Sequence, residues 1–401
     1  MVSIEQLVQL KAPGGMRLLA EVRATDPTPA TAITVATRLR KTFPPELVTA
    51  ALAMHDLRVR ARAKFDRADE LWFTRDGLEQ ATAEPIARHR ALRYAGASAI
   101  VDLCCGIGGD LLALAQVNPE ARLRAVDRDP VHLATVALNA TVMGVADRVT
   151  FVEADVGDVA LAGDEAVFID PARRTERGRM ARGESEPPLA WCIGLASGGR
   201  AVGIKAAPGI DHDLVPPGWE LETIALGFDL KEATLWSPAL ARAARTATVI
   251  AGDGVHTFGQ VPGPAVPLRT PEPGDTLLDP NPAITRAGLV ADLARSLGAS
   301  MIDPRIGFLV SSSPVATPFA RSLRVVASLP WHERELKRVL RELDAGPVNV
   351  RRRGLAGDVD AIAKRLRGRG ERPLTIAMTR VLDQPWAIVC DPALDRAPGV
   401  S

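Results

Sequence analysis

Apolar residues recur at helical spacing through the first 96 residues. The segments SIEQLVQL, TPATAITVATRLRK, PPELVTAALAMHDLRVRARAKF and EPIARHRALRYAG repeat them at intervals of three and four, which marks one face of an α-helix. The third segment starts at a proline pair and the last ends at Gly96, as helices commonly begin and end. We therefore predict a helical N-terminal region over residues 1–96.

The period changes at Ala97. Short apolar runs such as SAIVDL, LRAVD and EAVFID then alternate with amphipathic runs long enough for helices. Strands that alternate with helices at this spacing form a parallel sheet covered by helices on both faces. We predict an α/β, Rossmann-like, doubly wound domain over residues 97–257. ELETIALGF, ATLWSP and RTATVIAGD are its predicted closing strands, the first two antiparallel.

The C-terminal third divides in two. Proline and glycine dominate GQVPGPAVPLRTPEP, which can hold neither a ladder nor a helix, so residues 258–330 are predicted to be a linker with a connecting helix and strand. The order helix, strand, helix, strand, strand follows over residues 331–401. This order predicts a small α+β domain.

Composition excludes several classes of protein. The chain has 401 residues, which predicts two or three domains, and no run of eighteen apolar residues, which excludes a membrane span. The N-terminus has no basic flank followed by an apolar segment, so we expect a cytoplasmic protein. Four cysteines are too few and too poorly spaced for a disulfide scaffold or a zinc site, and no metal is predicted. With a net charge of +1, any affinity for nucleic acid depends on local patches.

The stretch 100-IVDLCCGIGGD-110 places small residues directly after a predicted strand. A glycine-rich turn between a strand and a helix lets a nucleotide-like ligand approach the backbone and the helix N-terminus. The dinucleotide pattern G-x-G-x-x-G fails in both registers, because Leu111 or Cys104 occupies a glycine position. The pattern that fits is an acid, three residues and Gly-x-Gly, from Asp102 to Gly108.

This pattern resembles motif I of class I S-adenosylmethionine-dependent methyltransferases, in the D-x-x-C-G-x-G form that RNA methyltransferases often carry. Cys104 stands where the usual pattern has its first glycine, and its small side chain preserves the loop. The resemblance implies S-adenosyl-L-methionine as the cofactor. The residues implied to bind it here are Asp102, Cys104, Cys105, Gly106 and Gly108. The two thiols are predicted to be packing residues, since no cation or base lies near them in the sequence.

Three later strand ends also carry acids. By the same resemblance, Asp127, followed by Arg128, binds the ribose hydroxyls, and Asp155, followed by Val156, accepts from the adenine amino group. Asp170-Pro171 stands at motif IV. The carboxyl ends of parallel strands lie at one crevice, so we expect the four acids to converge there. Each acid taken alone is equally well explained as a turn-forming or helix-capping residue. Gln80 and Thr82, upstream of motif I, are predicted to contact the methionine end.

Motif IV reads Asp170-Pro171-Ala172-Arg173, where families that methylate amino groups have D/N-P-P-Y/F. Arg173 occupies the stacking position, and a guanidinium plane can also stack. The form D-P-x-R resembles RNA 5-methyluridine enzymes too, but those need a cysteine in the next strand, where this chain has GIKAAPG around Lys205. We therefore expect transfer to a base nitrogen, with Asp170, Pro171 and Arg173 as the catalytic residues and Asp170 as proton acceptor. His212, after the fifth strand, is a weaker candidate base.

Two segments are rich in arginine. In 173-RRTERGRMAR-182, Arg174 and Arg177 are predicted to contact RNA phosphates, with an ordinary solvated loop as an equal alternative. In 351-RRRGLAGDVDAIAKRLRGRG-370, seven basic residues stand against two acids. The predicted RNA contacts there are Arg351, Arg352, Arg353, Lys364, Arg365 and Arg367.

The whole order resembles bacterial class I methyltransferases with a C-terminal THUMP-like domain. That resemblance implies an RNA substrate, tRNA or rRNA, for a S-adenosylmethionine-dependent enzyme. The alternatives are an RNA-binding protein that retains the fold without the chemistry, and a methyltransferase of proteins or small molecules. The oligomeric state stays open.

Overall fold

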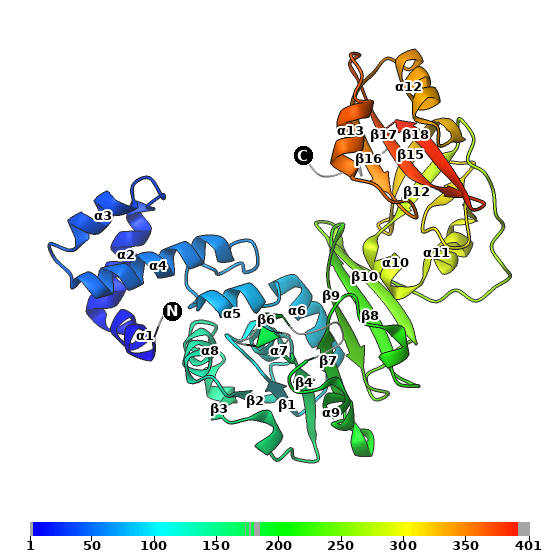
Figure 1. Ribbon diagram of the computed structural model, residues 1–401. Helices are drawn as coiled ribbons and strands as arrows, with labels where there is room; N and C mark the ends of the chain where they lie inside the picture. The colour runs from blue at the N-terminus through cyan, green and yellow to red at the C-terminus, as the bar shows by residue number, and fades with distance from the viewer. Residues whose placement is uncertain (1–2, 173, 176–177, 180–184, 392–401) are drawn as a thin grey trace. The chain divides into compact units, whose positions relative to one another are not determined.

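The computed structural model of the chain describes residues 3–172, 174–175, 178–179 and 185–391 (Figure 1). The chain forms two compact units. Unit 1 comprises Met1–Trp219 and Thr234–Ala241, and unit 2 comprises Glu220–Ala233 and Arg242–Ser401. The division falls within strand β9 (Asp229–Trp236).

Unit 1 begins with helices at the positions that the apolar spacing predicts. They are α1 (Ile4–Lys11), α2 (Pro13–Thr25), α3 (Ala32–Leu39), α4 (Pro45–Ala61), α5 (Arg75–Gln80) and α6 (Glu84–Ala91). A capping box starts α1, because the Ser3 side chain accepts from the Gln6 backbone while the Gln6 side chain accepts from that of Ser3. The apolar faces of α1 to α4 form one buried cluster around Leu10, Leu18 and Met54. Val131 and Leu138 pack against that cluster, so these helices are joined to the rest of unit 1.

The sheet of unit 1 is parallel and doubly wound, as predicted. Its order from one edge is β3-β2-β1-β4-β7, and each of these pairings is parallel. The strands are β1 (Ala99–Leu103), β2 (Arg122–Asp127), β3 (Val149–Glu153), β4 (Glu165–Ile169) and β7 (Val202–Ala206). The helices between them are α7 (Gly109–Val117), α8 (Pro130–Val142) and α9 (Leu189–Gly194). The carboxyl ends of β1, β2, β4 and β7 therefore lie along one edge, where a doubly wound sheet binds ligands.

A short hairpin follows β4, formed by β5 (Arg174–Thr175) and β6 (Gly178–Arg179). Arg173 and Arg177, predicted as a catalytic and an RNA-binding residue, lie outside the described residues.

Unit 2 takes up strands that we predicted to close the methyltransferase domain. Strands β8 (Glu220–Leu226) and β10 (Arg245–Ala251) pair in parallel, and β11 (Gly254–Gly259) pairs antiparallel with β10. Helix α10 (Pro282–Ala287) contacts β8 and β10, and the Thr223 hydroxyl donates to the Ala283 carbonyl at 2.8 Å. The strand order β11-β10-β8-β9-β7-β4-β1-β2-β3 includes the predicted closing strands, and β8 and β10 also pack against α10.

The remaining strands of unit 2 form a mixed sheet in the order β13-β14-β12-β15-β18-β17-β16. They are β12 (Thr276–Pro280), β13 (Ser300–Met301), β14 (Leu309–Ser311), β15 (Ala320–Pro330), β16 (Ala345–Arg352), β17 (Arg372–Val381) and β18 (Gln384–Asp391). The accompanying helices are α11 (Val290–Leu297), α12 (Glu333–Glu342) and α13 (Val359–Leu366). The helix and strand order predicted for residues 331–401 is confirmed.

Residues 258–330, predicted to be a linker with a connecting helix and strand, contribute several strands to the second sheet. Strand β15 lies between β12 and β18 in the sheet, and Leu277 and Leu323 are fully buried. These strands complete the hydrophobic core under β17 and β18, so they belong to the C-terminal domain.

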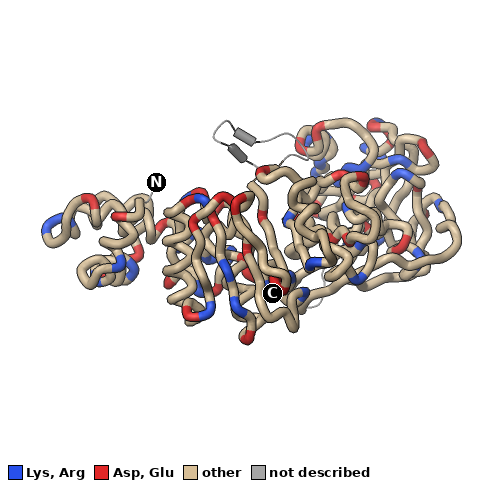
Figure 2. The backbone as a smooth tube through the Cα atoms, turned by 90° about the horizontal axis from the view of Figure 1, so that it is seen from below, with Lys and Arg blue, Asp and Glu red and all other residues tan. Residues whose placement is uncertain are grey.

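Charges of both signs alternate along the described backbone of each unit (Figure 2), in agreement with the small net charge. In the described part of the chain, no helix combines the length and the apolar character that a membrane span requires.

Candidate active site

Unit 1 contains a cavity of about 740 Å³ at the carboxyl ends of its parallel strands, here called the central cavity. Twelve of the predicted catalytic and cofactor-binding residues line it: Gln80, Thr82, Asp102, Cys104, Cys105, Gly106, Asp127, Arg128, Asp155, Val156, Asp170 and Pro171. Gly108 does not line the cavity but lies within its glycine loop. The fold therefore brings together residues that span ninety positions of the sequence.

The loop from Cys104 to Gly108 needs left-handed backbone conformations. Cys104 has a φ of +58°, Gly106 of +53° and Gly108 of +91°. A Cβ at Gly108 would lie 2.4 Å from a Val136 methyl carbon, so only glycine fits, whereas a Cβ at Gly106 would meet no heavy atom within 4 Å. Cys104 thus adopts the conformation of the glycine that the methyltransferase pattern has at this position. The loop delivers the N-terminus of α7 to the cavity.

Asp127 holds this loop in place. Its Oδ2 accepts from the Gly106 backbone nitrogen at 2.8 Å, and its Oδ1 accepts from the Asp129 backbone nitrogen at 2.9 Å. Each carboxylate oxygen has a second lone pair. The carboxylate therefore fixes the glycine loop and the start of α8, and it can still accept from ribose hydroxyls.

Asp102 has the most unusual environment in the cavity. It is 1% exposed, and neither carboxylate oxygen has a hydrogen-bond partner among the described residues. Burial raises the pKa of Asp102 well above its ordinary value, and the neighbouring carboxylates of Asp110 and Asp170 raise it further. A buried acceptor without a partner is costly unless a ligand satisfies it. A ligand with a positive charge and N–H donors, as S-adenosylmethionine has, fits this position.

Asp155 caps a short helix and also lines the cavity, and its contact with the adenine amino group stays a prediction. Its Oδ1 accepts from the Gly157 backbone nitrogen at 2.9 Å and caps the short 3-10 helix Val156–Asp158. Asp155 also lines the cavity, together with the buried Val156.

The segment before β1 closes one side of the cavity. Lys64 Nζ donates to the carbonyls of Leu78, Glu79 and Ala81 at 2.7, 3.1 and 2.8 Å, which fixes the end of α5. Gln80 is exposed at this side. The Thr82 hydroxyl donates to Asp110 Oδ2 at 3.1 Å and accepts from Arg90 at 2.9 Å, and Arg90 also pairs with Asp110. Thr82 therefore joins a buried network against α7.

Lys205 is a residue of the cavity wall that the sequence did not indicate. Its Nζ donates to Asp170 Oδ2 at 2.6 Å, and both residues line the central cavity. The lysine side chain is 4% exposed and that of Asp170 is 26% exposed. We had used Lys205 only to exclude a cysteine nucleophile. A lysine inside the otherwise apolar strand VGIKA was the signal, because buried lysine is rare unless it is paired.

The acceptor side of the cavity includes a segment that we also missed. Ala172 and Glu186 exchange two backbone hydrogen bonds of 2.8 and 2.9 Å. This bridge brings Pro187, Pro188 and Trp191 to the cavity wall. Arg128, predicted to bind the cofactor, donates to Glu186 Oε1 at 3.0 Å and so ties β2 to the same segment.

The two cysteines of the glycine loop do not supply an activated nucleophile. Burial raises the pKa of both Cys104 and Cys105, which keeps the thiols protonated, in agreement with a packing role. His212 lies in a 3-10 helix and is not among the residues that line the cavity. Within the described residues, no group of histidine, cysteine or acidic side chains is arranged to hold a metal ion.

In unit 2, three predicted RNA contacts have an internal partner. Arg351 pairs with Asp279 at 3.0 Å, and Arg353 pairs with the same carboxylate at 2.8 Å and lies over the Phe308 ring. Arg352 donates to the Gly357 carbonyl at 2.6 Å. The guanidinium groups of Arg351 and Arg353 therefore neutralise a nearly buried acid, and their contact with phosphates stays a prediction.

The other basic residues predicted in this segment are exposed. Lys364, Arg365 and Arg367 lie on α13 or directly after it, and Arg365 lies 3.6 Å from Glu333.

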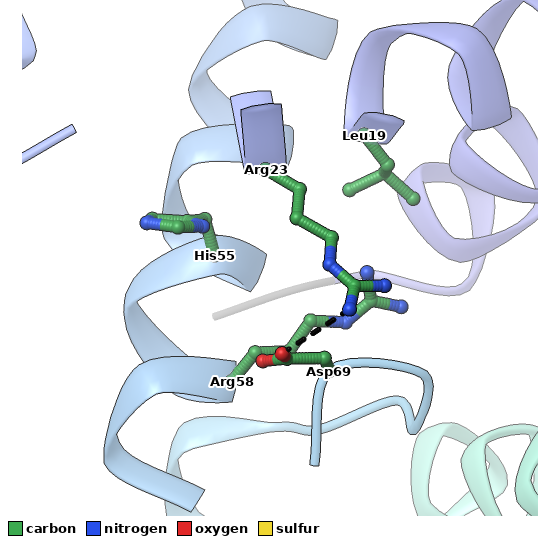
Figure 3. Close-up of a pocket in the computed structure, with 5 residues that line it drawn as sticks. All are labelled: Leu19, Arg23, His55, Arg58 and Asp69. Atoms are coloured by element: carbon green, nitrogen blue, oxygen red, sulfur yellow. Dashed lines mark ion pairs between the residues drawn. The ribbon is translucent and has the colours of Figure 1, made fainter. Parts of the chain in front are cut away.

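A second, much smaller cavity lies among the N-terminal helices (Figure 3). Leu19, Arg23, His55, Arg58 and Asp69 line it, and Arg23 pairs with Asp69 at 3.4 Å. Burial lowers the pKa of Arg58 to about 10, and its Nε donates to the Leu71 carbonyl at 2.9 Å. The volume is about 10 Å³, which is room for one water molecule. This cavity is a structural feature of the helical region.

The parallel sheet, the glycine loop and the acids at the strand ends define a class I S-adenosylmethionine-dependent methyltransferase, with a THUMP-like domain in unit 2. The chain belongs to the methyltransferase family that includes an uncharacterized S-adenosylmethionine-dependent methyltransferase of Mycobacterium tuberculosis, found in strains H37Rv and CDC 1551. The two are 36% identical over 343 residues, which cover 80% of this chain and 89% of the relative. S-adenosylmethionine is therefore the cofactor.

Family models match three parts of the chain. Residues 97–177 match the RNA cap guanine-N2 methyltransferase family, residues 320–392 match the THUMP domain-like family, and residues 3–61 match a domain of unknown function. A provisionally assigned methyltransferase from Porphyromonas gingivalis W83 shares the fold, with a TM-score of 0.67 and 18% identity over 87% of this chain and 92% of that chain.

Proposed function

We propose that the enzyme methylates a base nitrogen of RNA, either tRNA or rRNA. The observation that carries the proposal is the Asp170 carboxylate, which lines the same cavity as the glycine loop and is held by Lys205. The match of residues 97–177 to an RNA methyltransferase family and the THUMP-like match support RNA as the substrate class.

The residues that would hold the cofactor are already positioned. The glycine loop and the α7 N-terminus receive its methionine end, Asp102 takes the cationic amino group, and Asp127 takes the ribose. When bound, S-adenosylmethionine supplies a methyl group on a sulfonium, an electrophile whose leaving group is the neutral thioether. The protein then contributes alignment and a dry pocket.

Asp170 accepts the proton in this proposal. The base nitrogen forms a bond to the methyl carbon as the carbon–sulfur bond breaks, and the proton that the nitrogen loses passes to the carboxylate. Lys205 fixes Oδ2, while Oδ1 makes no hydrogen bond within the described part of the chain. Proton transfer follows methyl transfer, because the methylated nitrogen carries a positive charge and is acidic.

Exposed basic residues in the THUMP-like domain supply the contacts to the RNA backbone. Arg352, Lys364 and Arg367 are exposed, whereas Arg351 and Arg353 pair with Asp279. Phosphate contacts of this kind give salt-dependent affinity without base specificity.

Nucleoside mass spectrometry of tRNA and rRNA tests the proposal. RNA from a strain without the gene should lack one methylated nucleoside, and a plasmid with the wild-type gene should restore it. A plasmid with the D170N/K205M variant, which removes both charges together, should not restore it. If all nucleosides are unchanged in the deletion strain, the proposal of an RNA substrate is wrong, and a protein or a small molecule is the methyl acceptor.

A further inference from the structure

Motif IV of this chain lacks the aromatic residue that stacks on an acceptor base. Ala172 and Arg173 follow Asp170-Pro171. A base that leaves its stack for an active site needs an aromatic or apolar face to replace its neighbours. Among the described residues that line the central cavity, His132 and Trp191 are the aromatic ones.

His132 belongs to the cofactor side of the cavity. It lies on α8, its Nδ1 is 3.7 Å from Asp129 Oδ2, and its Nε2 would be 3.5 Å from a Cβ at Gly77. Gly77 lies beside the glycine loop. Asp129 lies beside Asp127, the carboxylate proposed to bind the ribose. His132 is therefore poorly placed for an acceptor beside Asp170.

Trp191 belongs to the acceptor side. It lies on α9, which contacts β7, the strand that carries Lys205 (Figure 1). The backbone bridge between Ala172 and Glu186 ties the segment before α9 to motif IV. Cys192 is fully buried and its thiol lies 3.8 Å from the Pro187 carbonyl, which fixes the first turn of α9. The helix of Trp191 thus contacts β7, and the segment before it is tied to the residues that follow Asp170.

We propose that Trp191 supplies the stacking face for the acceptor base, in place of the aromatic residue that motif IV lacks. The inference rests on the proposed function and narrows it to a flat heteroaromatic acceptor. Pro187 and Pro188 extend the apolar wall beside the indole. Trp191 lies on the helix that follows motif IV, and the backbone bridge holds the segment before that helix. The stacking residue and the proton acceptor are therefore far apart in the sequence.

The test compares W191F, which keeps an aromatic face, with W191L, which keeps apolar volume only. The control is A190Q, an exposed position on the same helix that does not line the cavity. For each full-length variant, kcat/KM is measured for methyl transfer to RNA from the deletion strain, and the Kd for S-adenosylmethionine is measured by calorimetry. We expect W191L to lower kcat/KM about 10- to 100-fold, the range of one lost base–aromatic stack, and W191F to retain most of it. The A190Q variant and all cofactor affinities should match the wild type.

Equal rates for W191L and the wild type, or equal losses in W191L and W191F, would overturn the inference while the proposed function stands. Loss of cofactor binding in W191L would overturn it too, since it would assign Trp191 to the cofactor side. If the wild type transfers no methyl group to RNA, the proposed function fails and the inference fails with it.

Discussion

Lys205 Nζ lies 2.6 Å from Asp170 Oδ2, at the carboxyl ends of two neighbouring parallel strands. The lysine is almost fully buried while the carboxylate reaches the cavity. The buried ammonium thus donates a hydrogen bond to a carboxylate at the wall of the cavity. Because only the lysine is almost fully buried, replacing the two residues should lower the stability of the protein by different amounts.

Replacing Asp170 should cost more stability than replacing Lys205. D170N removes the carboxylate that accepts a hydrogen bond from a buried ammonium, which we expect to lower the free energy of unfolding by about 3 kcal/mol, while K205M leaves a partly exposed carboxylate and costs about 1 kcal/mol. Urea unfolding of both variants and of D170N/K205M measures this. The double variant should be more stable than D170N alone; additive losses would contradict the account of a coupled pair.

The Asp102 carboxylate should contribute to cofactor binding and not to folding. In D102N the cofactor loses a charge-assisted hydrogen bond, so its Kd should rise about 10- to 100-fold. The free energy of unfolding should not fall, because the carboxylate has no protein partner to lose. Calorimetry and thermal unfolding check the two parts. A large loss of stability in D102N would mean that the carboxylate has a structural partner.

Cofactor binding should release a proton through Asp102. Burial raises the pKa of this acid, so the folded protein holds a proton above the ordinary value of 3.8 and loses stability as pH rises from there toward the raised pKa. A bound cation favours the ionised form, so the affinity for S-adenosylmethionine should increase with pH over this range. Calorimetry in buffers of different ionisation enthalpy measures the released proton. The D102N variant should release none, and equal release by both proteins would contradict the assignment.

Glycine should replace Cys104 with little loss of activity. A cysteine at a φ of +58° has a strained backbone, so C104G should gain roughly 0.5–1 kcal/mol after the entropy cost of glycine. The β-branched C104V should lose stability. Thermal unfolding with a methyl-transfer assay measures both effects. An inactive C104G with intact cofactor binding would show that the thiol has a chemical role.

Replacing Arg353 should lower the stability of the protein, whereas replacing Lys364 should weaken RNA binding. R353Q leaves the nearly buried Asp279 with less neutralisation and should lower stability by about 2 kcal/mol, whereas K364Q should leave stability unchanged. K364Q/R367Q should instead weaken RNA binding and reduce its dependence on salt concentration, because it removes phosphate contacts. Urea unfolding and filter binding at several salt concentrations separate the two. Normal stability of R353Q would contradict the structural role of this arginine.

The features that depend on residues close together in the chain could be predicted from the sequence. The acids at 102, 127, 155 and 170 lie within two residues of the carboxyl end of a strand, and their convergence follows from the parallel order of the sheet. The glycine loop likewise depends on neighbouring residues.

What the sequence did not reveal depends on distant partners. Lys205 is 35 residues from Asp170, and Arg353 is 74 residues from Asp279. Apolar spacing predicts that a strand exists but not its neighbours in the sheet, so β12 and β15 were assigned to a connection. Trp191 escaped notice because the backbone bridge, and not a motif, brings it to the cavity.

The most direct test of the central claim is transfer of a labelled methyl group from S-adenosylmethionine to RNA of the deletion strain. We predict incorporation by the wild type, and at least a 100-fold lower rate for D170N/K205M with unchanged cofactor affinity. Equal incorporation by both proteins, or none by the wild type, would contradict the claim that Asp170 and Lys205 form the centre of an RNA methylation site.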